Sequence, residues 1–296
     1  MNTPISRVRT DLVELLFWVL IGLLFFSLLG VVTAQFLYDV PLLQDPQALF
    51  SGTPSARRAL ILSQSLTSIG IFAFPAIMWS WRRSGVRPEL ALDKALSGRL
   101  VSQGILLMIV AIPMLNALIY FCNSLHYPSW LQWWIDAGER NTGLLELFLD
   151  MNGFGDLAVN LFVMAILPAL GEEMLFRGVI QPSLARRMNI HLAIWISALL
   201  FGLMHQNLVN LIPLTLLGGI LGYLRYWSGS LWLPILAHYT NNSLLLIFTF
   251  ILQRNGIGEE AVNQVGTPES GFFMAVISAL LVGFNLWLIK NSSRAA

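Results

Sequence analysis

Long apolar runs dominate the pattern of hydrophobic and polar positions along the chain. A transmembrane helix needs about 20 consecutive apolar residues, and runs of roughly this kind follow one another, separated by short polar segments. Their bounds are Leu12–Leu37, Ala59–Trp79, Val101–Cys122, Leu157–Leu175, Leu192–Met204, Val209–Tyr226, Leu231–Leu252 and Phe272–Ile289. The pattern predicts an all-α polytopic membrane protein with about eight transmembrane helices.

Composition supports this prediction and narrows the partners. Of the 296 residues, 56% are hydrophobic and only 11% are charged, where a soluble domain carries about 25% charged residues. The mean hydropathy is +0.70. A net charge of +1 gives no reason to expect a nucleic-acid partner. No internal repeat or flexible linker interrupts the chain, so we expect one integral membrane domain over residues 1–296.

Cysteine content and the first apolar run bear on disulfides and targeting. The single cysteine, Cys122, excludes an internal disulfide and any metal site built from several cysteines.

The first run follows Arg7 and Arg9, as in a secretion signal, but a signal has an apolar region of only about 7–15 residues. We therefore interpret this run as a retained signal-anchor helix.

Charges in the short connections predict the orientation of the spans. Lysine and arginine accumulate on the cytoplasmic side of membrane proteins, and a cytoplasmic N-terminus gathers most of them on that side. The inner set includes Arg82, Arg83, Arg87, Lys94, Arg99, Arg177, Arg186, Arg187 and Arg225. We expect both termini to be cytoplasmic and the protein to lie in a bacterial inner membrane. The long outer connection, residues 123–155, carries Trp130, Trp133 and Trp134, which favours a helix along the membrane interface.

The most polar stretch inside an apolar run is Gly171-Glu172-Glu173-Met174-Leu175-Phe176-Arg177-Gly178. A charge at bilayer depth costs about 3 kcal/mol on insertion scales, so three ionised side chains here need a reason. Glu173 and Arg177 are spaced i,i+4 and share a helix face, where they can form a pair. Glu172 lies about 100° round the same helix and is left without a partner in its own segment.

Further side chains with acid–base or ligand chemistry occur in two later runs. His205 lies i,i+4 from Phe201 at the end of the fifth run, and His238 lies i,i+4 from Asn242 in the seventh. A carboxylate, two imidazoles and a carboxamide from three helices can activate water and stabilise an oxyanion. The same groups can hold a metal such as zinc, with ligands from separate helices because no H-E-x-x-H occurs. The residues alone leave both uses open.

These residues fall into three motifs with a family resemblance. Glu172 to Arg177 resembles E-E-x-x-x-R, Phe201 to His205 resembles F-x-x-x-H, and His238 to Asn242 resembles H-x-x-x-N/D. All three are motifs of the CPBP family of CAAX proteases and bacteriocin-processing enzymes, also called Abi proteins. They occur here in the family's order and roughly at its spacing, within residues 157–252.

The resemblance implies an intramembrane endopeptidase of the metallopeptidase type. It implies that Glu172 activates the hydrolytic water with His205 as its partner. Glu173 and Arg177 would hold the shape of the site, and His238 and Asn242 would stabilise the oxyanion. The other assignment that it implies places a divalent metal, zinc above all, on Glu172, His205 and His238.

The resemblance also bears on the substrate. Eukaryotic members remove the last three residues of prenylated C-a-a-X proteins, and bacterial relatives are linked to peptide maturation, bacteriocin immunity and the processing of membrane proteins. We therefore expect a membrane-associated peptide or protein as the partner, within the lipid bilayer.

The depths of these residues conflict in a simple membrane topology. With Arg177 and Leu231 as inner-edge markers, Glu172 and His238 lie about 10 Å inside the membrane at the helical rise. His205 lies about 27 Å beyond Arg187 on the same rise. We expect either a bend near Gly202 or a segment over residues 178–188 that dips into the membrane.

Two rival functions remain in view. Tyr38-Asp39 and Gly153-Phe154-Gly155-Asp156 reproduce the paired motifs of intramembrane aspartyl proteases, but both aspartates fall at the outer boundary, where a dyad in mid-membrane cannot form. The other rival is a non-catalytic membrane protein, either an immunity or binding protein or a transporter with a buried ion pathway.

The glycines Gly218, Gly219 and Gly222 are expected to allow close helix packing rather than to bind a ligand.

Overall fold

The computed structural model describes residues 4–257 and 264–294, and the side chains of residues 13–257 and 264–293. All regular elements in these ranges are helical, which confirms the predicted all-α class. The α-helices are α1 (Pro4–Tyr38), α2 (Pro54–Ser68), α3 (Phe74–Trp81), α4 (Val86–Glu89), α5 (Gly98–Asn123), α6 (Gln132–Leu149), α7 (Phe154–Asn160), α8 (Leu167–Glu173), α9 (Gln181–Ala185), α10 (Ile190–Met204), α11 (Leu211–Ser228), α12 (Trp232–Arg254) and α14 (Phe273–Arg294). Short 3₁₀ segments are η1 (Pro46–Phe50) and η3 (Ser129–Leu131), and π-helical segments are η2 (Ile69–Ala73), η4 (Leu161–Ile166) and η5 (Met174–Ile180).

Six helical stretches in the described part of the chain are long and apolar enough to cross a membrane. They are Val13–Tyr38, Pro54–Trp81, Gly98–Asn123, Phe154–Ala185, Trp232–Arg254 and Phe273–Ser293. The fifth and sixth predicted spans form α10 and α11, of 15 and 18 residues, which lie outside this set. The protein is thus a polytopic membrane protein, and the count of eight spans stays a prediction.

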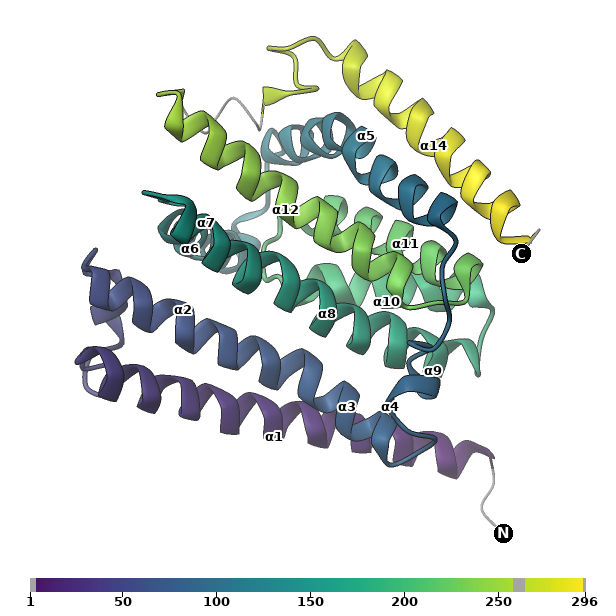
Figure 1. The fold of residues 1–296 in the computed structure, drawn as a ribbon, viewed down its shortest axis with the longest axis horizontal. Helices are drawn as coiled ribbons and strands as arrows, with labels where there is room; N and C mark the ends of the chain where they lie inside the picture. The colour runs from purple at the N-terminus through teal and green to yellow at the C-terminus, as the bar shows by residue number, and fades with distance from the viewer. Residues whose placement is uncertain (1–3, 258–263, 295–296) are drawn as a thin grey trace.

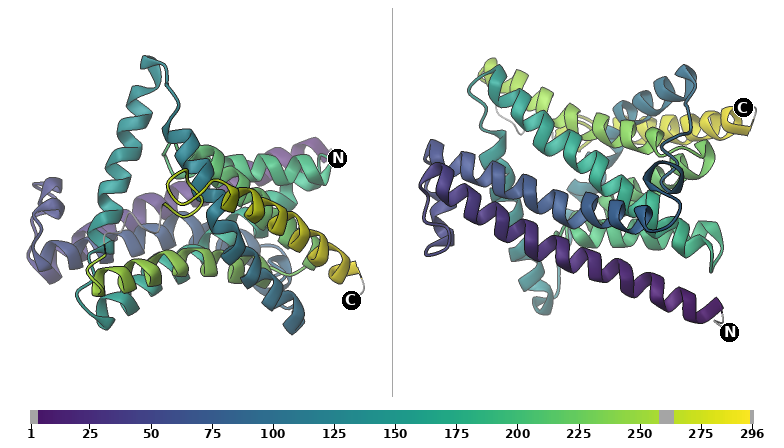
Figure 2. Two further views of the ribbon diagram at one scale, coloured as in Figure 1. Left: turned by 90° about the horizontal axis from the view of Figure 1, so that it is seen from above. Right: turned by 60° about the horizontal axis from the view of Figure 1, so that its bottom comes forward.

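The helices lie side by side, with α1, α2 and α3 along one edge and α5 and α14 along the other (Figure 1). The described start of α1 and the described end of α14 lie at the same end of the bundle, as an even number of crossings requires. Figure 2 shows α6 standing away from the other helices at its N-terminal end. Trp130 and Trp133 there are 72% and 66% exposed, which is consistent with the predicted interfacial helix.

The helix that carries the two glutamates runs for 32 residues, Phe154–Ala185, as α7, η4, α8, η5 and α9. Both of its π segments are followed by a proline at the second residue of the next helix, Pro168 and Pro182. Proline has no N–H, and its ring clashes with the carbonyl four residues earlier. The wider π turns accommodate these prolines, and π segments of this kind are frequent at functional sites.

A buried apolar cluster surrounds this helix in the middle of the bundle. Its members include Trp79 from α3, Leu175 and Phe176 from η5, and Phe201 from α10. By contrast, α1 exposes Leu16, Leu20, Leu24 and Leu28 on its outer face. The stretch with the three charged side chains, residues 171–178, therefore lies inside the protein, whereas the exposed positions of α1 are apolar.

Candidate active site

The two adjacent glutamates end α8 and lie inside the bundle. Glu173 is fully buried and Arg177, one turn later in η5, is 1% exposed. The sequence places Arg177 at the inner edge of the membrane; in the structure its helix continues for a further eight residues, to Ala185, and its charge is compensated within the protein. Nη1 of Arg177 donates to Oε1 of Glu173 at 2.7 Å, which confirms the predicted pair.

Two further contacts fix the guanidinium of Arg177. Its Nη2 donates to the carbonyl oxygen of Gly218 on α11 at 3.0 Å. Its planar head lies 4.5 Å from the ring centroid of Phe201, a cation–π contact. One turn later, Nε2 of Gln181 donates to the carbonyl of Gly222 at 3.1 Å. The glutamate-bearing helix is thus joined to α11 by two successive side-chain contacts.

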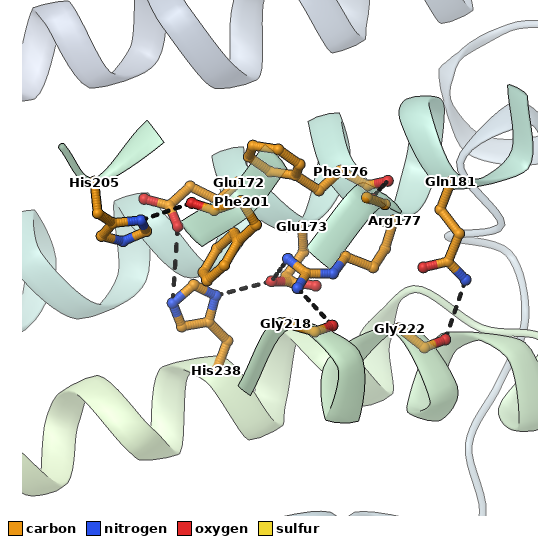
Figure 3. Close-up of polar contacts among 11 residues, drawn as sticks. Glu172, Glu173, Phe176, Arg177, Gln181, Phe201, His205, Gly218, Gly222 and His238 are labelled. Atoms are coloured by element: carbon orange, nitrogen blue, oxygen red, sulfur yellow. Dashed lines mark hydrogen bonds and ion pairs between the residues drawn. The ribbon is translucent and has the colours of Figure 1, made fainter. Parts of the chain in front are cut away.

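His238 on α12 lies between the two glutamates (Figure 3). Its Nδ1 is 2.9 Å from Oε1 of Glu173, and because a carboxylate only accepts, Nδ1 carries the hydrogen. Its Nε2 faces Oε2 of Glu172 at 3.9 Å. That oxygen of Glu172 is buried and has no hydrogen-bond donor among the described residues. The two atoms are too far apart for a direct hydrogen bond, although one water can contact both.

His205 follows the last residue of α10 and is half-buried. Its Nδ1 lies 2.9 Å from the carbonyl oxygen of Phe201, so Nδ1 donates and Nε2 of the neutral ring is an acceptor. The ring packs on Phe201 with a centroid distance of 4.9 Å. Figure 3 shows the carboxylate of Glu172 between the rings of His205 and His238.

Glu172 and His205 lie at similar distances from the ends of their own helices. The helix continues past Arg177 to Ala185, so Glu172 lies about 20 Å from that end at about 1.5 Å per residue. His205 lies about 22 Å from the start of α10 on the same rise. Helix α10 is unbroken at Gly202 and residues 178–185 are helical, and the position of residues 178–188 in the membrane stays a prediction.

Helix α12 reaches the same level because it begins inside the protein. The N–H of Leu231 donates to the carbonyl of Ala91 at 3.2 Å, and Nε1 of Trp232 donates to that of Leu92 at 2.9 Å. The segment between α4 and α5 therefore covers the start of α12. As a result His238, although near this start, meets Glu172.

Asn242 takes a different position from the one that the motif suggests. Its Nδ2 donates to the carbonyl of Met164 at 3.2 Å, in the π segment η4. Pro168 cannot donate to this carbonyl, so Asn242 supplies a hydrogen bond that the helix lacks. One amide hydrogen of Asn242 is used in this way, and its predicted oxyanion role stays a prediction.

The glycines of α11 allow close packing, as the sequence predicts. A Cβ on Gly218 would stand 3.1 Å from Cα of Ala198, and one on Gly219 would stand 2.8 Å from the ring of Trp195. A Cβ on Gly222 would meet Ile194 at 2.8 Å. These contacts hold α11 against α10, and the buried peptide carbonyls of Gly218 and Gly222 accept hydrogen bonds from Arg177 and Gln181.

A metal site on Glu172, His205 and His238 stays a prediction. Zinc sites use at least three protein ligands, and no group of three His, Cys, Asp or Glu side chains in the described ranges could hold a metal ion. Both histidines have Nδ1 engaged, and Nε2 of His238 faces Glu172, an orientation that suits a base or a donor. The chemistry is therefore derived below through water and protein side chains.

The aspartyl alternative lacks its dyad. Asp156 forms an ion pair with Arg57 at 2.8 Å, and its other oxygen accepts from the N–H of Asn152 at 2.9 Å. Asp39 follows α1 and is exposed. Since an aspartyl dyad shares a proton between two carboxylates, an aspartate bound to a cation does not meet the requirement.

Sequence reasoning missed one residue that shapes the site, Gln181, and gave no structural role to another, Phe201. Gln181 is 3% exposed, and its bond to Gly222 repeats the contact of Arg177 with Gly218 one turn earlier; the i,i+4 spacing of the two was the available signal. Phe201 is more than a motif position, since its ring contacts Arg177, His205 and His238. It separates the ion pair from the side of the site on which His205 lies.

Fold and site together define a class of protein: an all-α integral membrane protein with a buried carboxylate, ion pair and histidine cluster. Comparison with known families is consistent with this class. Residues 154–244 match the family described as Type II CAAX prenyl endopeptidase Rce1-like. Residues 154–244 are thus similar to this family, in agreement with the resemblance that the three motifs indicate.

Three curated proteins are similar to part of the chain. The "Putative membrane peptidase YdiL" of Bacillus subtilis (strain 168) is 29% identical over 114 residues, 38% of this chain and 46% of YdiL. An "Uncharacterized 24.3 kDa protein" of Escherichia coli is 36% identical over 110 residues, 36% of this chain and 50% of the relative. "Uncharacterized protein YpbD" of Bacillus subtilis (strain 168) is 31% identical over 84 residues, 27% of this chain and 40% of YpbD. The chain thus spans about half or less of each relative, and no solved structure matches it.

Proposed function

We propose that the protein is an intramembrane endopeptidase that hydrolyses a peptide bond with Glu172 as general base. One observation carries the proposal: Oε2 of Glu172 is buried without a protein donor and faces Nε2 of His238 at 3.9 Å. A buried carboxylate oxygen without a hydrogen bond is costly. One water held between these atoms satisfies both and is positioned for deprotonation.

The reaction follows from these positions. Glu172 takes a proton from the water as its oxygen attacks the carbonyl carbon of the substrate, which forms a tetrahedral oxyanion. Glu172 then returns the proton to the leaving nitrogen as the C–N bond breaks. Nε2 of His205 accepts the second hydrogen of the water and orients it.

His238 stabilises the oxyanion in this mechanism. Its Nδ1–H is held by Glu173, which directs Nε2 towards the reacting atoms. With His238 protonated, the charges of Glu172, Glu173, Arg177 and His238 cancel, which suits a buried cluster. An Nε2–H donor then meets the oxygen on which negative charge develops. Glu173 and Arg177 are positioning residues for this ring.

The proposed substrate is a membrane-associated peptide or protein. Three features support this class: the site is buried, membrane spans surround it, and the chain is similar to the "Putative membrane peptidase YdiL". The family description further suggests a C-terminal peptide of the CAAX kind. Metallopeptidase chemistry, which the resemblance implies, is not part of the proposal.

The experiment compares two glutamate variants of the full chain in detergent or lipid nanodiscs against a peptide library. Glu172→Gln should abolish cleavage while the protein stays folded. Glu14→Gln is the matched control, because Glu14 lies 3.5 Å from both Arg82 and Arg83, in a separate ion cluster. Equal cleavage by wild type and Glu172→Gln would refute the proposal.

A further inference from the structure

A pocket lies near the ends of α9 and α11 and the start of α10, and of the residues described above as shaping the active site it contains only Gln181. It has a volume of about 330 Å³, and its walls include Gln181, Arg186, Ile190, Arg225 and Tyr226. The helix ends around it lie at the end of the bundle where the described termini lie (Figure 1). It therefore faces the membrane boundary at that end.

The pocket carries two positive charges without a negative one. Its lining contains Arg186 and Arg225 but no carboxylate. Nε of Arg225 is buried and meets no hydrogen-bond acceptor in the described part of the chain. Among the described residues Arg186 donates to a neutral group, Oγ of Ser183 at 3.0 Å, and its guanidinium lies 5.8 Å from the ring centroid of Trp79, which is also neutral. A partly buried guanidinium without an anion is unfavourable, so the pocket lacks a counter-ion from the described protein.

We propose that this pocket binds the phosphate of an anionic phospholipid headgroup. Arginine presents a planar fork of donors that matches phosphate oxygens, and two arginines in one pocket can engage one phosphate. Tyr226 is 47% exposed, as is typical of aromatic residues at headgroup level.

An apolar helix face beside the pocket favours a lipid over a soluble anion. Helix α10, which begins at the pocket, exposes Leu192, Trp195 and Leu199, at 53%, 42% and 44%. Their spacing of i, i+3 and i+7 puts them on one helix face, opposite to Ile190 of the pocket wall. Lipid acyl chains can cover this face, so lipid is the source of phosphate that lies next to this helix.

The test uses the full chain purified in a neutral detergent. Its unfolding temperature is measured with added phosphatidylglycerol, phosphatidylcholine or inorganic phosphate, and bound lipid is counted by native mass spectrometry. Wild type should gain stability from phosphatidylglycerol alone and retain that lipid. Arg225→Gln should weaken retention by about tenfold or more, since it removes charge-assisted hydrogen bonds, and Arg186→Gln should weaken it as well.

Controls keep this test independent of folding and of peptidase activity. Arg99→Gln alters an exposed arginine outside the pocket and should leave lipid retention unchanged. Arg225→Lys keeps the charge without the fork and should bind at an intermediate level. Arg225→Gln should unfold no sooner than wild type without lipid, because it removes an uncompensated buried charge.

Three outcomes would overturn the proposal. They are equal retention of phosphatidylglycerol by wild type and Arg225→Gln, equal stabilisation by inorganic phosphate, and competition by a free peptide carboxylate that displaces the lipid. The second outcome would assign the pocket to a soluble anion, and the third to the end of a substrate.

Discussion

Glu173 accepts a hydrogen bond from His238 at 2.9 Å, and this contact joins the glutamate-bearing helix to α12 at the centre of the protein. The same oxygen of Glu173 accepts from Arg177 at 2.7 Å. One buried carboxylate therefore neutralises a guanidinium and sets the direction of an imidazole. Glu172, its neighbour in sequence, remains without a protein donor on one oxygen.

The two adjacent glutamates should behave differently when changed to glutamine. Glu173→Gln leaves Arg177 buried without its counter-charge, and loss of one partner of a buried pair costs about 3–5 kcal/mol. Glu172→Gln leaves the pair of Glu173 and Arg177 intact and alters only a longer contact, 3.9 Å to Nε2 of His238, so it should change stability less. Chemical unfolding in detergent, followed alongside peptide cleavage, measures both effects. Equal destabilisation by the two changes would contradict this division of roles.

His205 should be needed for cleavage but not for folding. His205→Asn retains a donor near the position of Nδ1, which can still reach the carbonyl of Phe201, but it lacks the acceptor at Nε2. We expect cleavage to fall by about 10²-fold or more, with the unfolding temperature close to that of wild type. His191→Asn is the control, because His191 contacts Tyr223 at 2.9 Å in an exposed position. Comparable losses in both variants would argue against a specific role for His205.

Much of the fold follows from the hydrophobic pattern, because apolar runs of membrane length have few alternatives to helix. The pattern does not give which arginines lie in the interior of the protein. Arg177 is an interior residue, and its helix continues to Ala185. A single sequence cannot tell a boundary arginine from a buried one unless its partner is recognised, and here Glu173 at i−4 was that signal.

The site was predictable as a set of residues but not as a geometry. Spacing indicated the pair of Glu173 and Arg177, and the motif resemblance brought His205 and His238 to it. The bond from Asn242 on α12 to the carbonyl of Met164 depends on Pro168 in the glutamate-bearing helix. No local sequence pattern relates these two helices. The second pocket arises from Arg186 and Arg225, far apart in sequence, and only packing brings their helices together.

Close packing of α10 and α11 should make Gly222 intolerant of a side chain. A Cβ there would meet Cγ2 of Ile194 at 2.8 Å and Oε1 of Gln181 at 2.9 Å, so Gly222→Ala should cost about 1–3 kcal/mol by overpacking. Gly283 on α14 has nothing within 4 Å of an added Cβ, and Gly283→Ala should be neutral or stabilise by up to about 1 kcal/mol. Unfolding of both variants in detergent tests this contrast, and equal effects would contradict it.

Removal of divalent metal ions should leave cleavage unchanged. Metal binding needs several donors at coordination distance, and no group of three suitable side chains in the described ranges provides them. We therefore expect wild-type protein treated with a chelator to keep its cleavage rate and its unfolding temperature. The parallel measurement is the metal content of active protein, which should be well below one ion per chain. Activity that is lost on chelation and returns with zinc would instead support Glu172, His205 and His238 as ligands. Such a site would require these side chains to approach one another more closely than the 3.9 Å between Glu172 and His238.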